Sequence, residues 1–297
     1  MEVAPQRTED LDWVLDMLRL SDTLQAAVKI RFLVQLQKLK LNQWPCVIFT
    51  DTAADDRNPI TLFIQDRGAS KSILQLFTTE DNLTRLEAFL RSPEVSQRLW
   101  KRSLDLPGLP QYMLPTLLSV ASDMRFTADT PVERCVFATD EAPAAPKALP
   151  GVVIQPLHET HLAKVLQHWE PAAGMVDPAS FFAGSLAAGL TAGVFALPET
   201  GAAPPPPSCL RAWALLNASG SIGVLHTEEA WRRRGYGTAV MATLSRACVE
   251  LGLHPCAATT KDNAASMGTL RRVGYREAFT GVWLLLSPAG DAADRAR

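Results

Sequence analysis

The sequence predicts a mixed α/β protein with two domains, on the strength of three observations. The chain has 297 residues, about twice the usual length of one domain. In both halves, apolar residues follow strand-like and helix-like spacings in alternation. Residues 139–150, between the halves, are rich in Ala and Pro and lack periodicity, which is typical of a linker. We therefore expect domains over 1–138 and 151–287, with a disordered tail over 288–297.

Composition and charge narrow the class of protein. Hydrophobic residues make up 47% and charged residues 20% of the chain, which favours a soluble globular protein over a disordered one. The formal net charge of −2 gives no electrostatic basis for nucleic-acid binding. No apolar run approaches the roughly 18–20 residues of a membrane helix, and the N-terminal segment does not resemble a signal peptide. We expect an intracellular protein with neither a membrane span nor a nucleic-acid partner.

Cysteine and histidine spacings argue against a metal. The five cysteines are scattered without a CxxC pair, which indicates reduced thiols, and the five histidines form no HExxH motif. His158 and His161 lie three residues apart, but no neighbouring ligand pattern completes a site. We interpret this pair as a solvated helix face and expect no metal cofactor.

Local patterns predict the elements of each half. In the first half we expect helices over 11–18, 81–91 and 111–122, and strands over 28–36, 44–49 and 60–64. In the second half we expect helices over 159–169, 178–188, 238–251 and 264–273, and strands over 152–154, 192–197, 211–217, 221–226, 255–260 and 282–286. The run from Pro204 to Pro207 predicts an exposed hairpin loop, with a weak partner contact as the alternative.

The most informative segment lies between an expected strand and an expected amphipathic helix. It consists of Arg232, Arg233, Arg234, Gly235, Tyr236 and Gly237. The two glycines let backbone N–H groups converge on an anion at the helix N-terminus, where a Cβ would strain the loop and crowd the anion. Arginine adds bidentate donors suited to phosphate. The segment predicts a phosphate-binding turn, although a solvated face is the plainer interpretation of an arginine run.

A second pattern follows about 25–30 residues later. It consists of the segment from Asp262 to Ser266 and then the segment from Leu270 to Tyr275. The order strand, Gly-rich turn, helix, strand, Asn-x-x-Ser, helix and Gly-Tyr resembles the GCN5-related N-acyltransferase superfamily, whose members use the first turn to hold the pyrophosphate of coenzyme A. A dinucleotide-binding fold is excluded because no third glycine follows in register, and a P-loop because Gly-Lys-Ser/Thr is missing.

Further segments resemble the glycine N-acyltransferase-like family. They are residues 42–45, 99–102 and 108–111 in the first half, and 212–216 and 229–236 in the second. The resemblance implies two acyltransferase-like domains, the N-terminal one degenerate, each with a mixed, mostly antiparallel sheet flanked by helices. It also implies transfer of an acyl group from acyl-CoA to the amine of glycine or another amino acid, by direct aminolysis of the thioester. The family's association implies mitochondria, while the N-terminus leaves the cytoplasm open.

The same resemblance assigns the acyl-CoA contacts. A bulged strand around Val224 and Leu225 would offer backbone N–H groups to the thioester and pantetheine, and the turn from Arg232 through Thr238 would hold the pyrophosphate. Asn263 and Ser266 would reach pantetheine or the phosphoribose. The alternative for these two residues is ordinary capping of a helix.

Three residues are candidates for the base. His226 ends the central strand and has a reference pKa near neutrality, whereas Glu228 and Glu229 could act as base or orient water. Plain alternatives are a strand-end histidine and solvated turn carboxylates. We expect Trp213 and Trp231 to be structural.

Two departures from the family pattern keep other functions open. Ala230 stands where related enzymes often carry a glutamate, and Leu270 where many superfamily members carry a tyrosine acid. The alternatives are a protein or polyamine N-acetyltransferase and a catalytically inactive acyl-CoA-binding or interaction protein.

Overall fold

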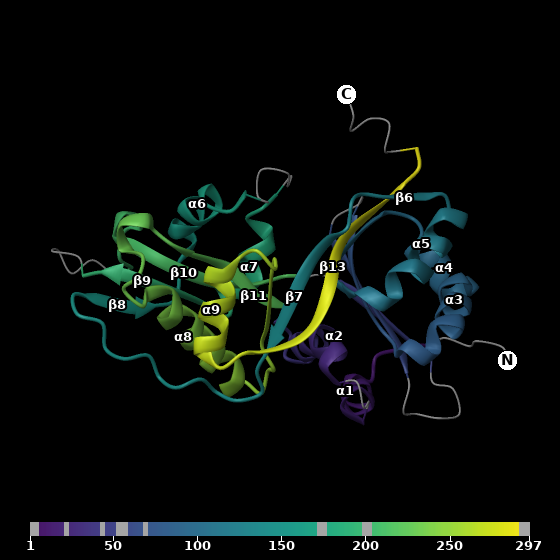
Figure 1. The fold of residues 1–297 in the computed structure, drawn as a ribbon, viewed down its shortest axis with the longest axis horizontal. Helices are drawn as coiled ribbons and strands as arrows, with labels where there is room; N and C mark the ends of the chain where they lie inside the picture. The colour runs from purple at the N-terminus through teal and green to yellow at the C-terminus, as the bar shows by residue number, and fades with distance from the viewer. Residues whose placement is uncertain are drawn as a thin grey trace. The chain divides into compact units, whose positions relative to one another are not determined.

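A computed structural model describes residues 6–20, 24–41, 45–51, 59–67, 71–170, 177–197 and 204–290 (Figure 1). The chain divides into two compact units. Unit 1 comprises residues 1–38, 43–136 and 278–297, and unit 2 comprises 39–42 and 137–277. The family resemblance at residues 42–44 and most of the predicted tail, 291–297, lie outside the described residues.

Unit 1 is a mostly antiparallel sheet covered by helices, as predicted. Its sheet order is β1-β2-β3-β4-β5-β13, with β6 paired to β13, and only β4 and β5 run parallel. The strands and helices are β1 (Gln6–Thr8), α1 (Leu11–Leu20), α2 (Leu24–Lys38), β2 (Cys46–Asp51), β3 (Ile60–Arg67), β4 (Lys71–Phe77), α3 (Leu83–Arg91), α4 (Pro93–Leu99), β5 (Ser103–Pro110), α5 (Leu114–Asp123), β6 (Phe126–Ala128) and, extending into unit 2, β7 (Val132–Ala138) and β13 (Arg276–Pro288). Short 3₁₀ turns, Glu80–Asn82 and Gln111–Met113, precede α3 and α5.

The strand predicted over 28–36 is wrong, because these residues belong to α2. Apolar residues alternate there, but the polar residues between them, Lys29, Arg31 and Gln35, are buried as well. The ammonium of Lys29 donates to the carbonyl of Pro107. A helix buried on all sides has no polar face, so its sequence lacks the 3.6-residue periodicity by which amphipathic helices are detected.

The last strand corrects the predicted domain boundary. Residues 281–288 of β13 pair with β5 and β6, and Val282, Leu284 and Leu286 lie in the hydrophobic core of unit 1. The expected tail also begins later, since Pro288 is the final residue of β13. The sequence predicted a strand here but assigned it to the C-terminal domain, because strand periodicity identifies a buried face without identifying its partner.

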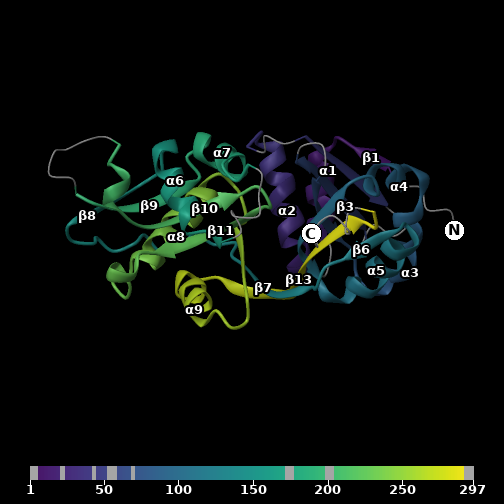
Figure 2. The ribbon, with the colours of Figure 1, turned by 90° about the horizontal axis from the view of Figure 1, so that it is seen from above.

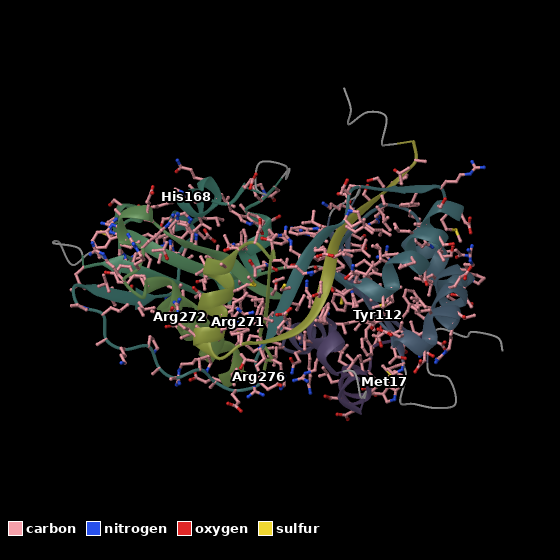
Figure 3. The ribbon with its side chains drawn as sticks, in the orientation of Figure 1. Met17, Tyr112, His168, Arg271, Arg272 and Arg276 are labelled. Atoms are coloured by element: carbon pink, nitrogen blue, oxygen red, sulfur yellow. The ribbon has the colours of Figure 1, made fainter. Side chains whose placement is uncertain are left out.

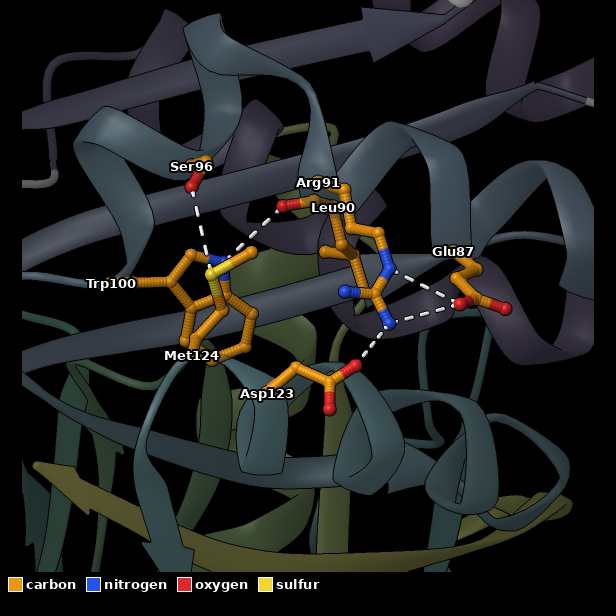
Figure 4. A network of polar contacts seen from close by, with 7 residues as sticks. All are labelled: Glu87, Leu90, Arg91, Ser96, Trp100, Asp123 and Met124. Carbon is orange, nitrogen blue, oxygen red and sulfur yellow. Dashed lines mark hydrogen bonds and ion pairs between the residues drawn. The ribbon is translucent and has the colours of Figure 1, made fainter. Parts of the chain in front are cut away.

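Surface contacts join three helices of unit 1 (Figure 4). At the end of α3, the guanidinium of Arg91 pairs with Glu87 at 3.0 Å and with Asp123 of α5 at 2.6 Å. The indole Nε1–H of Trp100, at the end of α4, donates to the carbonyl of Leu90 at 3.2 Å. Exposed ion pairs contribute roughly 0–1 kcal/mol each, so apolar packing between helices and sheet holds this layer together.

Unit 2 contains a four-stranded antiparallel sheet in the order β11-β10-β9-β8. Its elements are β8 (Val152–Gln155), α6 (Glu159–Gln167), α7 (Ser180–Ala187), β9 (Thr191–Ala196), β10 (Leu210–Asn217), β11 (Ser221–Thr227), α8 (Tyr236–Glu250), β12 (Cys256–Thr259) and α9 (Ala264–Val273). Short 3₁₀ turns, Pro207–Cys209 and Glu229–Trp231, precede β10 and follow β11. Every strand and helix predicted in the second half is present.

Helices cover both faces of this sheet. Figure 1 shows α6 and α7 on one side and α8 on the other, and Figure 2 gives the same layering from above. Strand β12 runs beside β11, but it is not hydrogen-bonded to it in the four-stranded ladder. The outer edge of β11 therefore lacks a ladder partner among the described strands.

Leu284→Ala tests the place of β13 in unit 1. Because Leu284 is fully buried in that core, we expect the free energy of unfolding to fall by about 2–5 kcal/mol. Leu285→Ala, on the half-buried side of the same strand, is the matched control and should cost much less. Urea denaturation followed by circular dichroism measures both, and equal losses would contradict the assignment.

Candidate functional site

One extra residue distorts β11 near its end. Trp213 of β10 pairs with His226, but Leu215 pairs with Gly223, so Val224 and Leu225 together oppose one residue of β10. Val224 adopts a φ of +54°, which is rare for a β-branched residue. This is the β-bulge that the family resemblance led us to expect around residues 223–226. A bulge leaves one residue out of the ladder and turns its backbone groups outward.

The Gly- and Arg-rich segment forms the turn between β11 and α8. Gly235 is the N-cap of α8 with a left-handed φ of +82°, and Arg233 has a φ of +62°. Gly237 lies inside the first turn of the helix, where a Cβ would stand 3.3 Å from Oγ1 of Thr227. The sequence-based expectation of strain therefore holds at Gly235 and is wrong at Gly237, where crowding replaces it.

The arginines of the turn are held in different ways. Arg232 donates through Nε to the carbonyl of Thr227 at 3.2 Å. Arg234 lies 4.6 Å from the ring centroid of Trp231, and Arg211 lies 4.9 Å from the same centroid. Cation–π stacking of this kind orients a guanidinium while leaving its N–H groups open to an anion. Arg232, Arg233 and Arg234 are all exposed.

The N-terminus of α8 thus combines two properties that bind anions. Tyr236, Gly237 and Thr238 are its first three residues, so their N–H groups have no partner four residues back in the helix. Three exposed guanidinium groups flank them. Converging backbone donors and positive charge suit a phosphate or diphosphate.

His226 lies one residue beyond the bulge and is half-buried. Its ring stacks on Trp213, with centroids 4.6 Å apart, and meets the ring of His168 at the same 4.6 Å separation. Figure 3 labels His168, which caps the C-terminus of α6. Burial lowers the pKa of His226, and nearby His168 and Arg232 lower it further, so its ring is neutral near pH 7 and can accept a proton.

Glu228 is committed to a different partner. Its carboxylate pairs with the ammonium of Lys164 at 2.5 Å. Lys164 also donates to the carbonyls of Pro207 at 3.3 Å and Leu210 at 3.0 Å. The hydrogen bond from Lys164 lowers the pKa of Glu228, which makes this carboxylate a weak base. Glu229, in the 3₁₀ turn that follows, is exposed.

Asn263 and Ser266 sit at the start of α9. Oδ1 of Asn263 accepts the backbone N–H of Ser266 at 3.0 Å, so Asn263 is the N-cap of the helix. The capping interpretation therefore accounts for the Asn263 carbonyl oxygen. Ser266 is half-buried, and its contact with coenzyme A stays a prediction.

The interpretation of His158 and His161 as a solvated helix face is wrong for His161, whereas His158 is exposed. His161 is fully buried, its Nδ1 accepts the N–H of His158 at 2.8 Å, and its Nε2 lies 2.7 Å from the carbonyl of Pro205. His158 is the N-cap of α6. The predicted exposure of the proline loop is wrong at the same point, because Pro205 is buried against α6.

Two further expectations concern aromatic and apolar positions. Trp213 is fully buried, as expected for a structural residue, and it also forms one wall of the His226 environment. Leu270 is buried, and the hydroxyl of neighbouring Tyr275 bonds Ser245 at 2.8 Å. Burial raises the pKa of Tyr275 strongly, so this tyrosine does not replace the proton donor missing at Leu270.

Sequence analysis missed His168 and Lys164. Their signal was nevertheless present, since His161, Lys164 and His168 recur at intervals of three and four residues and so share one helix face. Within the described ranges, no group of three or more His, Cys, Asp or Glu side chains gathers as a metal site. No helix in those ranges is long and apolar enough to cross a bilayer.

Residues 201–284 match the family model described as FR47-like protein. A Drosophila protein from a structural genomics programme has a similar fold, with a TM-score of 0.69 and 18% identity over 97% of this chain and 99% of its own. A GCN5-related N-acetyltransferase from Sphaerobacter thermophilus matches with a TM-score of 0.52 and 12% identity over 97% of this chain and 96% of its own. No curated protein sequence matched the chain.

These likenesses define the architecture. The two-unit fold is similar to that of a GCN5-related N-acetyltransferase over nearly the whole chain, and the FR47-like match lies within residues 201–284. This confirms the predicted fold class.

Lys164→Met tests the junction of α6, the proline loop and the turn. Removing the ammonium leaves two carbonyls and the Glu228 carboxylate without this donor, and we expect about 1–3 kcal/mol less stability at pH 7. Because folding lowers the pKa of Glu228, the ion-pair part of that difference is present above the usual pKa of 4.5 and is lost as pH falls below it. Urea denaturation at pH 7 and pH 3 measures both effects.

Lys147→Met, at an exposed linker position, is the control and should not change stability. Equal stability of Lys164→Met and the wild-type protein would contradict the importance of this junction.

Proposed function

We propose that this protein is an N-acyltransferase that moves an acyl group from acyl-CoA to the amine of glycine or another amino acid. The observation that carries the proposal is the succession, along residues 224–238, of the bulge of β11, the neighbouring His226 and the glycine-capped N-terminus of α8. The choice of an amino acid as acceptor rests on the resemblance of residues 212–216 and 229–236 to the glycine N-acyltransferase-like family. The same resemblance favours a mitochondrial location, with the cytoplasm as the alternative, and implies that the N-terminal acyltransferase-like domain is degenerate.

The residues of the turn fit coenzyme A. The backbone N–H groups of Tyr236 and Gly237 would hold the pyrophosphate, and Arg232, Arg233 and Arg234 would balance its charge. The N–H groups freed by the bulge at Val224 and Leu225 would meet the pantetheine and the thioester carbonyl.

The chemistry requires a neutral amine next to a polarised thioester. The amine nitrogen attacks the carbonyl carbon, the C–N bond forms and the C–S bond breaks, and coenzyme A leaves as a thiolate. The neutral imidazole of His226 takes the proton that nitrogen loses, and the thiolate takes a proton from solvent. Holding both reactants in place can supply about 7–11 kcal/mol of the barrier reduction. We favour His226 over Glu228 because Lys164 already occupies that carboxylate.

Glycine substitutions test the coenzyme A site. We expect Gly237→Ala to weaken acyl-CoA binding at least tenfold, about 1.4 kcal/mol, because its Cβ crowds the turn. Gly235→Ala should also weaken binding, through strain at a φ of +82°. Isothermal titration calorimetry measures both affinities.

Gly252→Ala is the matched control, since Gly252 also has a left-handed φ, +74°, but follows the other end of α8. It should lose stability without losing affinity. If the folded Gly237→Ala protein binds acyl-CoA with unchanged affinity, this turn is not the coenzyme A site. Arg232→Ala should show a smaller loss that shrinks at high salt.

His226→Ala tests the base. We expect kcat to fall by about 10²–10⁴ with little change in acyl-CoA affinity. In the wild-type protein, kcat/KM should fall as pH drops through the pKa of His226, which lies below its usual 6.5. Release of free thiol from acetyl-, benzoyl- and longer acyl-CoAs with a panel of amino acids measures both.

Three outcomes of this assay would redirect the proposal. Binding of coenzyme A without turnover for any pair would mark an inactive acyl-CoA-binding protein, consistent with Ala230 and Leu270. Acylation of peptides or polyamines, but not of free amino acids, would change the acceptor class. Full activity in His226→Ala would be consistent with the proposed transferase activity but would show that His226 is not its base.

A further inference from the structure

Three rings of unit 2 are in mutual contact beside the bulge. The centroid of His168 lies 4.6 Å from that of His226 and 5.6 Å from that of Trp213, and the third pair, Trp213 and His226, is 4.6 Å apart. Trp213 and His226 are paired across β10 and β11, whereas His168 comes from the end of α6. One wall of the cluster is therefore fixed by the sheet and the other by a single helix end.

That helix end is itself anchored. The imidazole of His161 lies 2.7 Å from the carbonyl oxygen of Pro205. The ammonium of Lys164 pairs with Glu228 and donates to the carbonyls of Pro207 and of Leu210 in β10. These contacts lie one and two turns before His168 on the same face. The backbone N–H of His168 donates to Val165 at 3.2 Å, which closes the helix. These anchors hold the end of α6 from which the His168 ring extends.

Charge at the cluster is asymmetric. The groups acting on His226 are His168 and Lys164 from α6, Arg232 from the turn, and one carboxylate, Glu228. Because the two ring centroids are 4.6 Å apart, a positive charge on His168 opposes protonation of His226. Glu228 acts in the opposite direction to these cations, but its carboxylate is paired with Lys164, whose charge opposes its effect on His226.

We propose that His168 is a positioning residue for His226, holding its ring against Trp213 and opposing its protonation so that it stays a neutral proton acceptor. The exposure of His168 supports a role beyond packing, because an exposed ring adds little to the core. The role of the neutral His226 ring as a base rests on the proposed function. The effect of His168 on the titration of His226 can be measured without any activity.

Two substitutions at His168 separate the effect of its aromatic ring on His226 from the effect of its positive charge. His168→Phe keeps a planar ring and removes the charge, whereas His168→Lys keeps a charge and removes the ring. The titration of the His226 ring is followed by NMR in the wild-type protein and each variant without coenzyme A, with the five histidines assigned by single substitution. His254→Asn is the control, since His254 follows the end of α8 opposite the turn and its imidazole lies 3.8 Å from Asp140.

We expect His168→Phe to raise the titration midpoint of His226 by about half a pH unit or more, and His168→Lys not to raise it. His254→Asn should leave the midpoint unchanged. A midpoint in His168→Phe within error of the wild-type value would overturn the proposal, as would an equal rise in both His168 variants. If His168→Phe fails to fold, His168→Asn takes its place with the same expected rise.

A second measurement links the pair to catalysis. In His168→Phe, the acidic limb of kcat/KM should move to higher pH with the NMR midpoint, while acyl-CoA affinity stays the same. If the NMR titration midpoint of His226 moves but the acidic limb of kcat/KM does not, His168 still affects the titration of His226. In that case the assignment of His226 as the catalytic base is wrong. A protein without turnover leaves the NMR result to decide the proposal alone.

Discussion

The geometry of the candidate site depends on one extra residue in β11, which forms a β-bulge. Val224 and Leu225 together oppose one residue of β10, and this mismatch sets the register of the residues that follow in β11. Without the bulge, the residues after Gly223 would pair one position out of step, and His226 would point to the opposite face of the sheet. The bulge therefore places the imidazole beside Trp213, and it costs a left-handed conformation at a valine. Strain of this kind, roughly 1–3 kcal/mol, persists only where the surrounding structure enforces it.

The sequence predicted the second half of the chain better than the first, for a physical reason. Helices α8 and α9 show helical apolar spacing, and β9 and β10 are short apolar runs, buried on both faces and bounded by turn residues, so the sequence pattern revealed them. The family motifs also fall within these elements, and they located the turn and the bulge. Helix α2 gave no such signal, because Lys29 and Arg31 are buried along with its apolar residues.

The parts of the candidate site that were missed arise from tertiary contacts. His168 and Lys164 are ordinary polar residues of a surface helix until α6 packs over the ends of β10 and β11. The sequence allowed Asn263 either to contact coenzyme A or to cap a helix. Its side-chain oxygen accepts the backbone N–H of Ser266, so this oxygen caps α9. Spacing along a helix shows which side chains share a face, but not which charged group that face will meet.

The position of β13 bears on how the chain is made. Unit 1 is closed by contacts such as Ser103 to Ser287 and Asp105 to Trp283, which join residues 184 and 178 positions apart. Proteins assembled from the N-terminus fold each domain as it leaves the ribosome, but this unit lacks a core strand until residues 137–277 of unit 2 have also been made. Its apolar sheet edge at β5 must wait through the synthesis of unit 2. A nascent chain of this design exposes that edge to chaperones, or to another unfinished copy, for longer than a chain of two consecutive domains would.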